Sequence, residues 1–262
     1  MKKRGLLYFL VAISFVLNSC KEEAKNEIAE DNAISSDSLT KDTSVEEKRA
    51  AEQKYYVIAP SGLSLRKDNN LQSEKLLGML LGSEVLLLEA AATNEIEVEH
   101  IKGGMHKISY NGQTGYAFSG YLSPIHLPKQ NQATEDYLAD LKEEFPEVRF
   151  KSKANDPDFH EGTTDTFTLP ATSWHEAFYI VSAMYQLPKS LGFPNPSGPE
   201  QTVTEDTKKP KDAWDSFLTA TRKNNSLEKI EYSYRAEGFG YTVTITRPTD
   251  TGFAVEYLGF VD

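Results

Sequence analysis

Apolar and polar residues alternate with a period of two in two parts of the chain, a pattern typical of β-strands with one buried face. In residues 55–125 the alternation includes Leu63 and Leu65, and then Val85 and Leu87. Near the C-terminus three longer segments alternate in the same way. Their apolar positions are Ile230, Tyr232 and Tyr234, then Tyr241, Val243 and Ile245, then Phe253, Val255 and Tyr257. We therefore predict two β-rich regions, the second containing a three-stranded antiparallel meander.

Three segments between these regions space their apolar residues as amphipathic helices do. The first begins at Thr134 and ends before Pro146, the second opens with the capping box Ser173 and Glu176, and the third spans residues 211–223. The second and third helices each carry a tryptophan, and we expect these two to cover the apolar face of the meander. For residues 134–262 the prediction is therefore an α+β domain, an antiparallel meander with helices on one face.

Two polar segments are predicted as loops, with a short strand at residues 166–169. Residues 188–210 are rich in proline. Residues 151–164 contain Asp156, Asp158, His160 and Glu161, which invite a metal-binding interpretation. Their spacing does not match a calcium loop, so we expect a solvated acidic loop and no metal site.

The N-terminus has the pattern of an export signal. Lys2, Lys3 and Arg4 precede an apolar run of about a dozen residues, too short for a transmembrane helix of roughly 20 residues. We assign residues 1–19 as a signal peptide. Leu17–Cys20 resembles the lipobox of bacterial lipoproteins, which implies cleavage before Cys20 and acylation of its thiol. The alternative is an ordinary signal peptide with a chance cysteine.

Residues 20–54 follow as the lipidated cysteine and an acidic tether. Beyond Cys20 the segment has few large apolar residues until it ends at Lys54, so it cannot bury enough surface to offset the entropy of ordering. Lys21, Glu22 and Glu23 resemble a signal that sends lipoproteins to the outer leaflet of the outer membrane. A periplasm-facing anchor in that membrane is the alternative.

The charge of the chain limits its partners. The formal net charge is −11, and 28 basic residues minus the three in the signal leave 25 against 39 acidic, or −14. Such a surface is repelled by nucleic acid and by anionic lipid head groups. We expect no nucleic-acid partner and attachment to the membrane through the acyl group alone. With Cys20 the only cysteine, no intrachain disulfide can form.

Residues 55–125 resemble a bacterial SH3-like domain. The resemblance lies in Gly62–Arg66, in Leu77–Val85 and in the hairpin Lys107–Tyr116, which is followed by Gly120-Tyr121-Leu122. It implies a small β-barrel, of a kind that commonly targets proteins or binds substrates. The chain departs from the family at Met105-His106, where a tryptophan is frequent, and in a long acidic insertion at 90–104. Residues 126–133 are then a linker to the α+β domain.

The resemblance implies that aromatic residues around the closing hairpin contact a ligand, and the candidates are Tyr110, Tyr116, Phe118 and Tyr121. For Tyr116 and Tyr121 the alternative is a place in the barrel core. No serine has the glycine-flanked setting of a nucleophile, and the five histidines lack metal-ligand spacing. We predict no cofactor.

The predicted function is that of a non-enzymatic, membrane-anchored cell-envelope lipoprotein that recognises peptidoglycan or an envelope protein. The alternative is a cell-wall hydrolase with a C-terminal catalytic domain, because glycosidase carboxylates leave no local motif.

Overall fold

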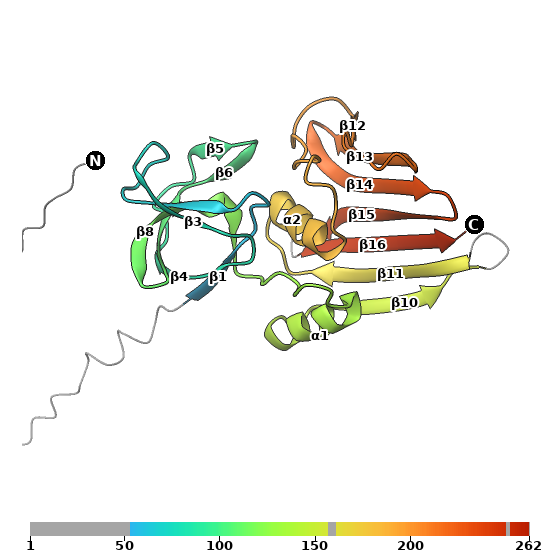
Figure 1. Cartoon of the computed structure of the whole chain (residues 1–262), viewed down its shortest axis with the longest axis horizontal. Coiled ribbons are helices and arrows are strands. Elements are labelled where there is room, and N and C mark those ends of the chain that lie inside the picture. The colour runs from blue at the N-terminus through green and yellow to red at the C-terminus, as the bar shows by residue number, and fades with distance from the viewer. Residues whose placement is uncertain (1–52, 157–160, 250–251, 262) are drawn as a thin grey trace, which may run out of the picture. The chain divides into compact units, whose positions relative to one another are not determined.

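The first of two large antiparallel β-sheets is formed by the N-terminal half of the described chain (Figure 1). The structure is a computed structural model that describes residues 53–156, 161–249 and 252–261. The predicted signal peptide, Cys20 and nearly all of the tether lie outside these residues. The strand order of the first sheet is β3-β2-β8-β7-β4-β1-β9. Its strands are β1 (Gln53–Val57), β2 (Leu63–Arg66), β3 (Lys75–Met79), β4 (Glu84–Glu89), β7 (Met105–Tyr110), β8 (Gln113–Phe118) and β9 (Leu122–Ser123).

Of the four apolar residues named for the alternation in this sheet, Leu65 and Val85 are at most 1% exposed. Leu63 and Leu87 are only partly buried and pack against the same core. The sheet is open, however, and not the closed barrel that the resemblance implied. Its edge strands β3 and β9 are not neighbours in the hydrogen-bonded order. Pro124 follows β9 directly and has no N–H for a ladder bond, so this edge strand ends after two residues.

Two hairpin turns in this half of the described chain have left-handed backbone positions, one in the first sheet and one in a separate two-stranded sheet. Asn111 and Gly112 join β7 to β8 with φ of 50° and 78°, the tight hairpin turn that Asn-Gly predicts. The acidic insertion forms its own hairpin from β5 (Ile96–Val98) and β6 (Ile101–Gly103), turned by Glu99 and His100. A 3₁₀ turn, η1 (Ser119–Tyr121), connects β8 to β9.

The second sheet has the order β10-β11-β16-β15-β14-β13-β12. Its strands are β10 (Phe150–Ala154), β11 (Glu161–Leu169), β12 (Gln201–Glu205), β13 (Ala213–Lys223), β14 (Ser226–Ala236), β15 (Phe239–Thr249) and β16 (Gly252–Val261). The predicted meander is β14-β15-β16, extended by two strands on each side. All described residues belong to one compact unit, which is mostly β.

The described residues contain two α-helices, α1 (Thr134–Glu144) and α2 (Trp174–Met184), where the sequence predicted three. At the start of α2 the Ser173 side chain accepts a hydrogen bond from the Glu176 N–H, as a capping box requires. Trp174 contacts Phe253 of β16 edge to face, with ring centroids 4.9 Å apart, so α2 covers the meander (Figure 1). Neither helix is long and apolar enough to cross a membrane, and this holds for the described residues only.

The helix predicted at 211–223 is wrong, because this segment is strand β13. Its buried positions Ser216, Leu218 and Ala220 alternate, and all three are at most 2% exposed. The helix was predicted from a different set, the helical spacing of Ala213, Trp214, Phe217, Leu218 and Thr221. Pairing with β14 decides between the two periods. Trp214 therefore covers nothing and is 59% exposed. The two predicted loops were also partly wrong, since they contain β10, the start of β11, and β12.

Candidate ligand-binding cleft

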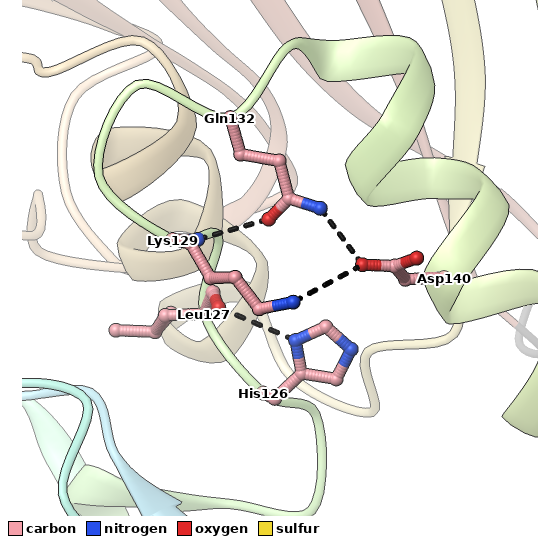
Figure 2. A network of polar contacts seen from close by, with 5 residues as sticks. All are labelled: His126, Leu127, Lys129, Gln132 and Asp140. Atoms are coloured by element: carbon pink, nitrogen blue, oxygen red, sulfur yellow. Dashed lines mark hydrogen bonds and ion pairs between the residues drawn. The ribbon is translucent and has the colours of Figure 1, made fainter.

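The predicted linker between the two sheets is held against α1 by polar contacts (Figure 2). The Gln132 side chain accepts a hydrogen bond from the Lys129 N–H at 2.9 Å and donates one to Asp140 Oδ2 at 2.8 Å. Lys129 Nζ lies 3.9 Å from the same carboxylate. From α1, the fully buried Tyr137 donates its hydroxyl proton to the carbonyl oxygen of His126 at 2.7 Å. The linker thus has a defined path beside α1.

The first sheet is joined to α2 by a buried carboxylate. Glu176 is 4% exposed and accepts hydrogen bonds from Ser123 Oγ of β9 at 2.6 Å and from the Thr172 N–H at 2.7 Å. In the sequence, Trp174, Phe178, Val181 and Tyr185 recur at helical spacing, and this predicted that Glu176 and His175 point away from the apolar stripe of the helix. Instead, Glu176 is buried at the junction between the sheets, because Ser123 and Thr172 satisfy its charge there.

His175 lies at the same junction. Burial lowers the pKa of its imidazole to about 4, and a hydrogen bond with the backbone of Gly120 in η1 partly opposes this effect. Its ring also contacts Phe193 edge to face, with centroids 6.0 Å apart. His175 is therefore neutral near pH 7 and packs between the two halves of the described chain.

A cleft of about 580 Å³ opens at this junction. Its size falls in the range of roughly 300–1,000 Å³ that is usual for ligand sites. The first sheet, the linker and the segment from α2 onward all contribute to it. The apolar lining residues are Ile58, Pro60, Leu81, Leu127, Pro128, Tyr179, Ala183, Leu187, Pro188 and Leu191, and the polar ones are Gln130, Ser182, Gln186 and Lys189. The cleft is a mostly apolar site with a few polar groups and one cation.

The β3–β4 turn presents two leucines to solvent. Gly82 has a φ of 79°, and its N–H donates to the Val57 carbonyl at 2.8 Å, which fixes the turn against β1. Leu81 lines the cleft and is 38% exposed, whereas the adjacent Leu80 is not among the lining residues and is 77% exposed. An exposed apolar side chain at the mouth of an apolar cleft is available to a ligand.

Two of the predicted ligand residues lie behind the wall of this cleft. Phe118 and Tyr121 are 3% and 9% exposed, with ring centroids 5.8 Å apart. Tyr121 in turn contacts the cleft residue Tyr179 at 5.8 Å and donates its hydroxyl proton to Glu99 Oε2 at 2.7 Å. Burial and this hydrogen bond raise the pKa of Tyr121. Phe118 and Tyr121 can therefore position Tyr179 but are themselves covered.

The other predicted residues lie elsewhere on the first sheet. Tyr110 and Tyr116 are half-buried, and neither lines the cleft. The Tyr110 hydroxyl is 3.4 Å from Ser83 Oγ, one residue beyond the cleft residue Gly82. Of the acidic loop, Asp158 and His160 fall outside the described residues. Within the described ranges, no three His, Cys, Asp or Glu side chains are placed to hold a metal ion.

The cleft residues were not predicted from the sequence. Leu80-Leu81 before Gly82 was a usable signal, because two adjacent leucines cannot both point inward from a tight turn. Nothing local marked Tyr179 or Lys189, which reach the cleft only through the packing of α2 against the linker.

The chain matches no family model, no curated protein and no solved structure. Its function must be inferred from the residues and their geometry.

Proposed function

We propose that this protein is a cell-envelope lipoprotein, anchored in the outer membrane through acylated Cys20, that binds a peptide segment in the cleft between its first sheet and α2. It acts as a binding protein and not as an enzyme. The observation that carries the proposal is the cleft itself, which is apolar and open to solvent, with Leu81 at its mouth.

The lining favours a peptide. Leucine, proline and tyrosine side chains suit apolar peptide side chains, whereas Gln130, Ser182 and Gln186 offer donors and acceptors for a peptide backbone. Lys189 adds a positive charge that attracts a carboxylate. Peptides with carboxylates occur both in the stems of peptidoglycan and in envelope proteins. Both could therefore offer the same groups to the cleft, and the experiment must distinguish these two sources of the ligand.

The anchor and tether complete the proposal. The mature chain carries a charge of −14, so an anionic lipid surface repels it and the acyl group is the proposed membrane link. An acidic tether before residue 55 would leave the cleft free to reach ligands away from the membrane.

The test uses the full-length chain purified in mild detergent, added separately to isolated cell-wall sacculi and to solubilised envelope proteins. We expect binding in one of these arms and no release of soluble wall fragments. Leu81→Glu should weaken binding at least about tenfold, because it places a charge where apolar contact is needed. Leu80→Glu is the matched control in the same turn and should bind as the wild type does.

Three results would overturn the proposal. They are failure of the wild type to bind in either arm, equal binding by Leu81→Glu, and release of wall fragments by the purified protein. The third would show an enzyme.

A further inference from the structure

A row of aromatic rings crosses the helix-facing side of the second sheet, and none of its residues lines the cleft. We name it the tyrosine strip, and it consists of Tyr185, Tyr257, Tyr241, Tyr234 and Phe239. Tyr257 shares its sheet face with Phe253, which contacts α2. Successive ring centroids along the strip are 5.0, 5.7, 5.5 and 5.6 Å apart. The four tyrosines are half-buried and Phe239 is 46% exposed, so α2 does not cover the strip completely.

A glycine keeps the strip flat. Gly259 pairs with Tyr241 and lies beneath the Tyr257 ring, where an added Cβ would come within 2.8 Å of the Tyr257 hydroxyl. Because no side chain stands at this position, the Tyr257 ring can lie along its strand and stack on Tyr185 with an interplanar angle of 3°. The arrangement is a built aromatic platform.

One end of the strip has polar atoms without partners. Asp165 of β11 pairs with Tyr257, and its Oδ1 is buried with no hydrogen-bond partner among the described residues. The Tyr185 hydroxyl is also buried, and it lies near Thr134 without a hydrogen bond of normal geometry. Burial, with the nearby Asp165 charge adding to it, raises the pKa of both Tyr185 and Tyr257. A buried carboxylate oxygen without a donor is costly unless something supplies one.

We propose that the Asp165 end of the tyrosine strip binds the primary ammonium group of a ligand, such as a lysine side chain. An ammonium has N–H donors for the unpaired carboxylate oxygen and a positive charge that opposes it. The same charge is attracted to the faces of the surrounding tyrosine rings. An anion would be repelled by Asp165, and a neutral apolar group would leave the oxygen unpaired. This second site goes beyond the proposed function and does not depend on the cleft.

The test measures binding by calorimetry on the full-length chain in mild detergent. The probe is Nα-acetyl-lysine methylamide, and its Nε-acetylated form is the neutral control. The wild type should bind the amine and not the acetylated form. Asp165→Asn keeps the shape of the side chain and should weaken binding at least about tenfold, the usual scale for a lost hydrogen bond to a charged group. Glu256→Gln is the matched control, because Glu256 precedes Tyr257 on β16 but is exposed on the opposite face.

The aromatic contribution is tested at Tyr257. Tyr257→Phe retains the ring and should bind within about twofold of the wild type, whereas Tyr257→Leu should bind several-fold more weakly. Asp165→Asn should unfold at the same or a higher temperature than the wild type, because it removes a carboxylate with one buried oxygen that has no partner. The loss of binding then cannot come from misfolding.

Any of three results would overturn the proposal. They are no binding by the wild type, equal affinity of the wild type for the neutral probe, and unchanged affinity for the amine in Asp165→Asn. Leu81→Glu should leave amine binding intact, so failure of this site and failure of the cleft can be distinguished.

Discussion

Acid should destabilise this protein through His175. The imidazole is packed at the junction of the first sheet and α2, and burial lowers its pKa from 6.5 to about 4. In the unfolded chain His175 therefore binds a proton below pH 6.5, whereas in the folded chain it stays neutral until the pH approaches 4. The stability contribution is fully present above pH 6.5 and falls as the pH drops toward 4.

The magnitude follows from the two pKa values. A difference of one pH unit corresponds to about 1.4 kcal/mol, so His175 should reduce the free energy of unfolding by about 3 kcal/mol between pH 7 and pH 4. This is a large share of the roughly 5–15 kcal/mol that stabilises a typical domain. Urea unfolding of the full-length chain, followed by circular dichroism at both pH values, measures it.

His175→Gln is the control, since glutamine does not titrate but still has donors for the Gly120 backbone. Other groups also respond to acid, so the informative quantity is the difference between wild type and variant. We expect the variant to lose about 3 kcal/mol less than the wild type on going to pH 4. If the two lose the same amount, His175 is not buried neutral at the junction and the packing described there is incorrect.

Four further predictions concern the core, the exposed Trp214, the junction and the anchor. Phe253→Ala should lower the free energy of unfolding by about 3–5 kcal/mol because Phe253 is 1% exposed. Trp214→Ala should change it by less than about 0.5 kcal/mol, and a large loss would mean that Trp214 is a core residue after all. Glu176→Ala should lower the free energy of unfolding by about 2–3 kcal/mol in the same urea assay, because the Ser123 hydroxyl loses its buried acceptor. An unchanged midpoint would contradict that hydrogen bond. Cells fed a clickable fatty acid should label the wild type and not Cys20→Ser, and equal labelling would refute acylation at this residue.

The sequence predicted best those elements whose pattern has a single interpretation. Asn111-Gly112 forces a hairpin, Ser173 with Glu176 caps a helix, and the alternation from Ile230 onward continues long enough to exclude a helix. In each case the local chemistry and the final packing favour the same structure.

The prediction failed where a pattern fits two periods or where distant packing decides. Residues 213–223 place apolar side chains at spacings that suit a helix and a strand equally, and only pairing with β14 settles the matter. The cleft combines Leu81 with Lys189, more than a hundred residues further along the chain, so no local motif could have indicated it.

Site-specific cross-linking in living cells tests the binding cleft most directly. A photoreactive residue at Lys189, which lines the cleft, should capture an envelope component on irradiation, and Leu81→Glu in the same chain should abolish the capture. The same residue at Lys153, exposed on β10, should capture nothing above background. Capture at both positions, or at Lys189 regardless of Leu81→Glu, would contradict a ligand-binding cleft at this junction.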